Sequence, residues 1–249
     1  ALERAITPET VLVSVQHANN EVGTLQPIEE AAQLAHQQGA LFHTDAVQTF
    51  GKLPLHAPNA GADLVSISGH KLGGLKGAGA LYLRSGVSLH PLLWGGPHEH
   101  KMRAGTENVV GIIALGEAAQ VSFQELQSGE LQRIAQLRDK LETGLKDQIP
   151  KIQINGHPQN RLPGTLNVSF LGCKGETLLM ALDLAGICVS TGSACSAGST
   201  APSAVLKAMG LSSDQIEGSI RFSCGSGTTE SEIDEALRLI PDLVERVRS

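Results

Sequence analysis

The sequence predicts an α/β protein with a mostly parallel sheet, followed by a smaller part of α+β type. Three observations support this prediction. Short apolar segments of strand length alternate with an amphipathic helical segment up to about residue 83. Alternation of strand and helix implies that consecutive strands pair in parallel. After about residue 117 the pattern changes to long amphipathic helices and then to shorter strands, which indicates a second unit.

The first part is expected to contain four strands and one well-defined helix. The helix covers residues 27–38, because Pro27 suits the first helical turn and Gly39 is typical of a helix end. The strands are predicted at residues 11–15, 40–44, 63–67 and 79–83. In parallel sheets of this kind, ligands bind at the carboxyl ends of the strands.

The second part is expected to begin with two connector helices, at residues 117–127 and 131–148. Strands are then predicted near residues 152–154, 166–170, 187–190 and 220–223, and helices near residues 176–184, 202–209 and 230–248. We therefore expect one domain at residues 1–116 and another at residues 117–249. The chain opens almost directly on a strand that leads to site-like residues, so we expect part of the sheet to be missing from it.

The composition of the 249 residues argues against several classes of function. The net charge is -6 and no basic stripe is visible, which argues against nucleic acid as a partner. No apolar run approaches the length needed to cross a bilayer, and the N-terminus lacks a secretory signal, so no membrane partner is expected. The 4 cysteines have neither zinc-like spacing nor the number of a disulfide framework. This favours a reducing, cytoplasmic location.

Two charged residues at predicted strand ends suggest a site. Lys71 follows the third strand in Ser68-Gly69-His70-Lys71, and Asp45 ends the second. A desolvated lysine can form a Schiff base with an aldehyde, and a carboxylate can keep a pyridinium nitrogen protonated. Each also has a purely structural interpretation, Lys71 as an exposed loop lysine and Asp45 as a helix N-cap. One strand–crossover–strand unit separates them, which favours a shared crevice.

Two of the cysteines are candidates for a nucleophile. Cys195 lies in a run of small residues at 190–199, and Cys173 lies in the loop Gly172-Cys173-Lys174-Gly175. A nucleophilic thiol needs exposure and access to its thiolate form, and both positions satisfy this requirement. Cys188 and Cys224 are expected to be core residues of strands.

Five motifs follow one another along the chain. They are His17-Ala18-Asn19-Asn20-Glu21-Val22-Gly23, His43-Thr44-Asp45-Ala46-Val47-Gln48, Ser68-Gly69-His70-Lys71, Arg103-Ala104-Gly105-Thr106-Glu107-Asn108 and Ser193-Ala194-Cys195. In order and spacing they resemble the signatures of cysteine desulfurases of the NifS and IscS type, in the class V aminotransferase group. The resemblance runs from about Val11 to the C-terminus. It implies the PLP-dependent transferase fold type I, with pyridoxal 5'-phosphate (PLP) as cofactor and L-cysteine as substrate.

The resemblance implies roles for the residues that match the motifs. Lys71 would bind PLP covalently and then move the Cα proton of the substrate. Asp45 would pair with the pyridine nitrogen, and Gln48 would bond to the ring hydroxyl oxygen. Asn20 would line the cofactor and substrate site, and Arg221 would bind the substrate carboxylate, for which its planar fork is suited.

Further implied roles concern the phosphate and the sulfur. Ser68, Gly69 and His70 would hold the phosphate, and Thr106 would reach the phosphate of the neighbouring subunit's cofactor in a homodimer. Cys195 would take the sulfur of L-cysteine as a persulfide. It would also be a transient iron–sulfur ligand during delivery to an iron–sulfur scaffold or another acceptor protein.

The resemblance has gaps, and other interpretations stay open. The family's Gly-Gly-Gly-Gln-Glu-Arg segment is here Gly95-Gly96-Pro97-His98-Glu99-His100, and its earlier phosphate loop and ring-stacking histidine have no counterpart. The resemblance therefore implies an N-terminally truncated member. His98 and His100 alternate on a loop, as solvated side chains often do and as metal ligands can. The other interpretations are a selenocysteine lyase, another class V transaminase, or a non-catalytic fragment that binds a partner.

Overall fold

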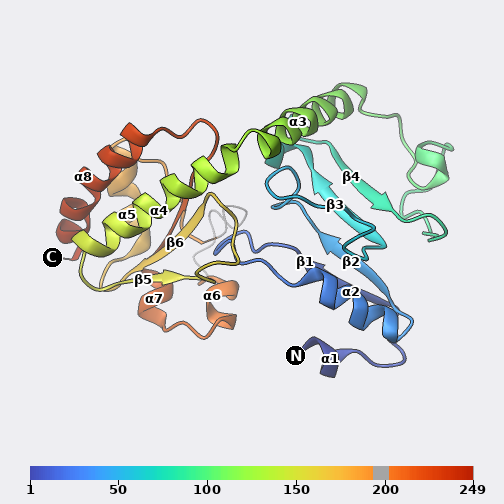
Figure 1. Cartoon of the computed structure of the whole chain (residues 1–249), viewed down its shortest axis with the longest axis horizontal. Coiled ribbons are helices and arrows are strands. Elements are labelled where there is room, and N and C mark those ends of the chain that lie inside the picture. The colour runs from blue at the N-terminus through green and yellow to red at the C-terminus, as the bar shows by residue number, and fades with distance from the viewer. Residues whose placement is uncertain (193–201, 249) are drawn as a thin grey trace. The chain divides into compact units, whose positions relative to one another are not determined.

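The structure is a computed structural model that describes residues 1–192 and 202–248. The chain forms two compact units, each with its own sheet (Figure 1). The first unit consists of residues 1–18 and 26–128, and the second consists of residues 19–25 and 129–249.

The boundary between the units lies after helix α3 (Val109–Gln127), at residue 128, and not at residue 116 as predicted. The helix begins at Val109 rather than near residue 117 and packs on the 3-10 turn η1 (Gly69–Leu72). Leu115 is buried against this turn, where a Cβ added to Gly69 would lie 3.4 Å from Leu115 Cδ1. The segment expected to be a connector is therefore the second half of a helix that belongs to the first unit.

The sheet of the first unit has the strand order β1-β2-β3-β4. Its strands are β1 (Leu12–Gln16), β2 (Leu41–Asp45), β3 (Leu64–Ser68) and β4 (Gly79–Leu83). The first three are parallel, whereas β4 is antiparallel to β3. Residues 69–78 are too few for the crossover that a parallel pair needs, so the chain returns in the opposite direction. The mostly parallel sheet predicted from the sequence is confirmed.

Helix α2 (Ile28–Gln37) covers one face of this sheet. Pro27 is its N-cap residue and Gly39 follows its end with φ +74, as the sequence predicts. The core between helix and sheet consists of Val13, Ile28, Ala31, Ala32, Ala35, Ala40, Phe42, Ala46, Ala60, Ala62 and Val65. A short helix, α1 (Leu2–Ala5), precedes β1. Small alanine side chains allow α2 to approach the strands closely.

Helix α3 contradicts the prediction that no apolar run in the chain is long enough to cross a bilayer. Among the residues that the structure describes, α3 is long and apolar enough to cross a bilayer by length and composition alone. Glu117 and Glu125 are its only charged residues. Its exposed large apolar side chains are Val109, Val110, Ile112, Ile113, Val121 and Phe123. Within the first unit, these side chains have little to pack against.

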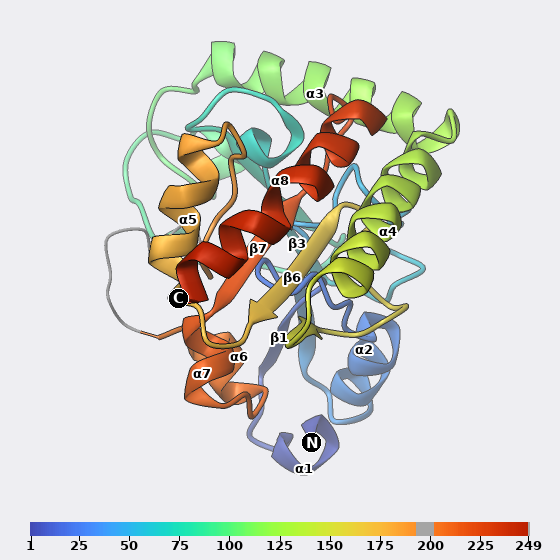
Figure 2. The same ribbon diagram turned by 90° about the vertical axis from the view of Figure 1, so that its left-hand side faces the viewer.

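The second unit has an antiparallel sheet with helices over one face (Figure 2). The strands, in the order β5-β6-β7, are β5 (Ile152–Asn155), β6 (Thr165–Phe170) and β7 (Ser219–Ser223). The covering helices are α4 (Glu130–Gln148), α5 (Gly175–Leu184) and α8 (Glu230–Arg248). Their apolar faces pack with β6 and β7 into one core, in which Phe170 and Phe222 meet edge to face. Two short helices, α6 (Ala204–Ala208) and α7 (Ser213–Glu217), complete the part of this unit that the structure describes.

Two elements of the second unit differ from the sequence prediction. The strand expected at residues 187–190 is reduced to an isolated bridge, in which Ser190 pairs with Arg221. Helix α7 was not predicted, although Ser212 and Gln215 form the capping box that starts it. The Ser-x-x-Gln spacing was the available signal, but a helix of one turn has no apolar periodicity to support it.

Asp63 is a fully buried carboxylate that joins three elements of the first unit. It accepts hydrogen bonds from Phe42 N in β2 (2.7 Å) and from His36 Nε2 in α2 (2.9 Å), and it pairs with Arg84 Nε beyond β4 (2.5 Å). Burial opposes ionisation of Asp63, but the Phe42 amide, His36 and Arg84 outweigh burial and lower its pKa. The carboxylate therefore stabilises the folded unit in its charged form.

We expect Asp63→Asn to lower the free energy of unfolding at pH 7 by about 1–3 kcal/mol, because it removes a buried charge from its partners. A lowered pKa contributes stability that is present above the unfolded-state pKa of about 3.9 and is lost as the pH falls through the folded-state value. The variant should therefore lose less stability than the wild type below about pH 4. Urea unfolding at pH 7 and pH 3 measures both effects. Substitution of the exposed Glu9 by glutamine is the control, and equal curves for all three proteins would contradict the role of Asp63.

Candidate functional site

The carboxyl ends of β2 and β3 lie side by side in the first unit. The two strands pair in parallel, with Asp45 opposite Ser66. Asp45 is the last residue of β2, Ser68 is the last residue of β3, and Lys71 follows within η1. The Asp45 carboxylate is exposed and the Lys71 side chain is half-buried. A carboxylate and an amine thus lie at the same edge of the sheet, where ligands of α/β proteins bind.

The turn after β3 carries a hydroxyl and an imidazole in contact. Ser68 Oγ lies 2.8 Å from His70 Nδ1. The Gly69 amide between them donates to Ala78 O at 2.9 Å, so it is already paired within the protein. The implied place of the Gly69 backbone at the phosphate, between Ser68 and His70, stays a prediction. Gly69 allows close packing, because an added Cβ would lie 3.2 Å from Ala78 O.

The turn after β2 is organised by Asp45 itself. Asp45 Oδ1 accepts a hydrogen bond from Val47 N at 2.9 Å, the pattern of an Asx turn. The residues after Asp45 form a hydrogen-bonded turn, in which Phe50 N donates to Ala46 O at 2.8 Å, so Asp45 caps one turn in place of the longer helix of the N-cap interpretation. Gln48 lies half-buried in this turn. The carboxylate at the strand end thus also fixes the backbone that carries Gln48.

A chain of hydrogen bonds crosses the three parallel strands just before the site. His43 Nδ1 lies 2.7 Å from Ser14 Oγ in β1, and His43 Nε2 lies 2.8 Å from Ser66 Oγ in β3. Burial lowers the pKa of His43, and the charge of Asp45 opposes this effect only in part. A neutral imidazole can donate to one serine and accept from the other. This chain of hydrogen bonds was not predicted, although the polar residues inside otherwise apolar strands were a signal for it.

The groups at this edge fit PLP chemically. A phosphorylated pyridine aldehyde calls for an amine to bind the aldehyde, a carboxylate for the ring nitrogen and polar donors for the phosphate. Lys71, Asp45 and the Ser68–His70 pair supply these groups from two adjacent strand ends. Of the residues that the resemblance assigns to the cofactor, Lys71, Asp45, Ser68 and His70 therefore lie at the ends of these two strands in the first unit.

The segment before α3 carries Thr106 and the two histidines. Thr106 is exposed, and the neighbouring Gly105 amide donates to His98 Nδ1 at 3.4 Å. The residues from Glu99 to Lys101 all have positive φ, which non-glycine residues rarely adopt. Across residues 1–192 and 202–248, no group of three or more His, Cys, Asp or Glu side chains could hold a metal ion. Within that part of the chain, His98 and His100 thus have no third ligand.

Asn20 and Arg221 meet in the second unit. Arg221 Nη1 donates to the backbone oxygen of Asn20 at 2.7 Å. Arg221 lies in β7 and forms an isolated antiparallel bridge with Ser190. Arg221 N donates to Ser190 O at 2.7 Å, and Ser190 N donates to Arg221 O at 3.1 Å. The guanidinium that the resemblance assigns to the substrate carboxylate is thus held in position by the peptide that carries Asn20.

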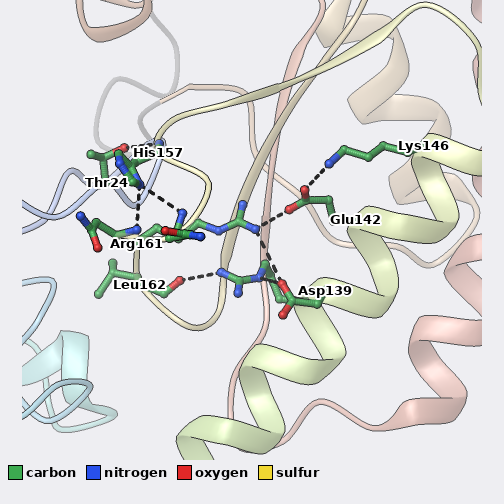
Figure 3. A network of polar contacts seen from close by, with 10 residues as sticks. Thr24, Asp139, Glu142, Lys146, His157, Arg161 and Leu162 are labelled. Atoms are coloured by element: carbon green, nitrogen blue, oxygen red, sulfur yellow. Dashed lines mark hydrogen bonds and ion pairs between the residues drawn. The ribbon is translucent and has the colours of Figure 1, made fainter.

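A polar network joins α4 to the loop that contains Arg161 and Leu162 (Figure 3). Arg161, whose side chain is 5% exposed, donates to Glu142 of α4, and Lys146 pairs with the same carboxylate. Burial opposes ionisation of Glu142, but Lys146 and Arg161 lower its pKa. Beside Arg161, Leu162 N donates to Gly23 O at 2.9 Å. This network was not predicted, because nothing in the spacing of the residues links α4 to residue 161.

The environments of the cysteines separate the candidates. Cys173 is 3% exposed, and burial raises the pKa of its thiol, so it is unsuited as a nucleophile. Cys188 is exposed rather than in the core, because residues 187–190 form no strand. Cys224 is half-buried, and burial raises its pKa also. Cys195 lies outside the described residues, so its assignment rests on the sequence motif.

The comparisons with known proteins agree with this arrangement. A family model described as Aminotransferase class-V matches residues 1–236. Cysteine desulfurase 2 of Trichormus variabilis is 50% identical over 248 residues, which are 100% of this chain and 62% of that protein. The crystal structure of a NifS-like protein from Rickettsia africae is 33% identical, with a TM-score of 0.88 over 98% of this chain and 64% of that one. A structure of SspA in complex with cysteine is 33% identical, with a TM-score of 0.73 over 92% of this chain and 62% of that one. The chain thus spans less than two thirds of the length of these relatives.

The exposure of the thiols predicts their order of reaction with iodoacetamide in the folded protein. Cys188 should be alkylated at least about tenfold faster than Cys173, because the reagent can reach the exposed Cys188, whereas Cys173 is buried and burial raises the pKa of its thiol. Mass spectrometry of peptides after timed labelling measures the two rates. Denaturation in urea should make the rates similar, and fast native labelling of Cys173 would contradict the buried environment.

Proposed function

Because the chain belongs to the class V aminotransferase family, we propose that the complete protein is a PLP-dependent cysteine desulfurase that forms a persulfide on Cys195. The observation that supports the proposal most is that Asp45, Lys71 and the Ser68–His70 pair lie at the carboxyl ends of two adjacent parallel strands. The names of relatives such as cysteine desulfurase 2 of Trichormus variabilis support it. The proposal concerns the complete protein, since the chain spans 62% of that relative.

The residues of the first unit would bind the cofactor and move the substrate proton. When bound, PLP supplies an electron sink for the bonds at the substrate Cα. Lys71 Nζ would bind the aldehyde and then, displaced by substrate, take the Cα proton. The Asp45 carboxylate would hold the proton on the pyridine nitrogen, with Gln48 at the ring hydroxyl. Ser68 and His70 would hold the phosphate, with Thr106 of the neighbouring subunit in a homodimer.

The residues of the second unit would bind the substrate and take its sulfur. The Arg221 guanidinium suits the α-carboxylate of L-cysteine, next to Asn20. The Cys195 thiolate would attack the substrate sulfur, so that an S–S bond forms and the Cβ–S bond breaks. The electron pair of the Cβ–S bond stays with the carbon, which takes up a proton. The products are L-alanine and one persulfide, and no external oxidant or reductant is needed.

The partners and the location are part of the same proposal. Exposed apolar side chains on α3, together with Leu92, Leu93 and Trp94 in the segment before it, support association with a second subunit. A persulfide carrier needs an acceptor, for which an iron–sulfur scaffold or another acceptor protein is the natural choice. Cys195 would then be a transient iron–sulfur ligand. A reducing cytoplasm would keep the thiols reduced.

Incubation of the complete protein with PLP and L-cysteine should yield L-alanine and a persulfide on Cys195. Lys71→Ala should reduce alanine formation by about 100- to 10,000-fold, the usual contribution of proton transfer by a positioned side chain. Cys195→Ala should abolish the persulfide. Cys173→Ala is the matched control and should retain it, because Cys173 is buried. A persulfide that survives Cys195→Ala and disappears in Cys173→Ala would overturn the assignment of the thiol, and absence of alanine in the wild type would overturn the function.

A further inference from the structure

Glu21 is a buried carboxylate to which the proposed function gives no role. It is 4% exposed and belongs to the short segment 19–25 of the second unit. Burial of a carboxylate is costly unless polar groups bind it. The residues that contact this carboxylate therefore indicate why an acidic side chain stands here.

The backbone on either side of Glu21 is fixed by three hydrogen bonds. Asn19 Oδ1 accepts from the Glu21 amide at 2.8 Å, and Asn167 Nδ2 in β6 donates to Glu21 O at 3.3 Å. Arg221 Nη1 in β7 donates to Asn20 O at 2.7 Å. The side chain of Glu21 thus starts from a peptide that is attached to two strands of the sheet.

The carboxylate of Glu21 binds Ser203, the residue before α6. Ser203 Oγ donates to Glu21 Oε2 at 2.6 Å and accepts from Leu206 N at 3.1 Å as the N-cap of the helix. The single hydroxyl proton of Ser203 is therefore given to Glu21, while its lone pair caps α6. The start of α6 is held by the buried carboxylate.

The same carboxylate lies beside Gly192. A Cβ added to Gly192 would lie 3.6 Å from Glu21 Oε2 and 3.8 Å from Ser203 Cβ. Two residues earlier, Ser190 is hydrogen-bonded to the backbone of Arg221. Gly192 and Ser203 are thus neighbours in space, although residues 193–202 separate them in the sequence. Cys195 belongs to this intervening segment.

We propose that Glu21 is a positioning residue for sulfur transfer: its carboxylate binds Ser203 and thereby fixes where the segment that carries Cys195 rejoins the fold, next to Gly192, the residue after which that segment begins. This proposal rests on the proposed function for its catalytic consequence. Glu21 itself touches neither substrate nor cofactor in this role. Its removal should therefore slow the step that uses Cys195 and leave the binding of L-cysteine to the PLP-loaded protein intact.

Single-turnover experiments on the complete PLP-loaded protein test the proposal. Glu21→Ala and Ser203→Ala should each slow persulfide formation on Cys195 by about tenfold, the factor that corresponds to about 1.4 kcal/mol. The double variant should be slower by about tenfold as well, rather than hundredfold, because the two residues act through one hydrogen bond. The change in cofactor absorbance on addition of L-cysteine should keep its wild-type amplitude and concentration dependence.

Two controls separate this role from general loss of structure. Ser203→Thr keeps a hydroxyl donor and should restore a rate within about threefold of the wild type. Ser212→Ala removes the N-cap of α7, an equally short helix of the same unit, and should leave the persulfide rate unchanged. Additive effects of Glu21→Ala and Ser203→Ala, or an equal slowing in Ser212→Ala, would overturn the positioning role.

A measurement without substrate distinguishes failure of this inference from failure of the proposed function. Elastase should cleave between residues 193 and 201 at least about threefold faster in Ser203→Ala than in the wild type or in Ser212→Ala, because one end of the segment is released. Equal cleavage rates would show that Glu21 and Ser203 do not hold the segment. A wild-type protein that forms no persulfide on Cys195 would instead contradict the proposed function.

Discussion

The parallel pairing of β2 with β3 is the constraint on which the candidate site depends. Parallel neighbours end at the same edge of a sheet, so residues that are distant in sequence become adjacent without any direct bond between them. Asp45 and the turn from Ser68 to Lys71 are brought together in this way. Two sets of hydrogen bonds stabilise this register. His43 bonds to serines of β1 and β3, and the buried Asp63, just before β3, accepts from the Phe42 amide of β2. A slip of β3 by one residue would turn the side chains of that strand to the opposite face of the sheet.

Helices and strands with a regular apolar pattern and a clear first or last residue could be predicted from the sequence. The helix between Pro27 and Gly39 and the four strands of the first sheet have local signals, and the structure contains them within one residue at each end. The late start assigned to α3 has a physical reason. Its apolar residues lie on several sides of the helix and show little periodicity, so its first two turns were not recognised.

The parts that sequence analysis missed are contacts between distant polar residues. The ion pair of Arg161 with Glu142 joins a loop to a helix, and no spacing rule relates the two positions. The burial of Cys173 also depends on its surroundings, since the same Gly-Cys-Lys-Gly loop could be exposed on another scaffold. Patterns in a sequence report on neighbours within one element, whereas these environments are made by residues from several elements. Candidate residues could therefore be named in advance, but their ionisation and partners could not.

The second unit is discontinuous, because residues 19–25 belong to it while the residues on both sides belong to the first unit. A fragment that starts at Gly129 would lack the peptide that accepts from Arg221 and Asn167, and both donors would lose those partners. Neither unit can be excised as one uninterrupted stretch of gene. Cleavage of the chain at Ser128 would separate the fragment from residues 19–25, so any shortened form of the second unit has to supply that segment as well.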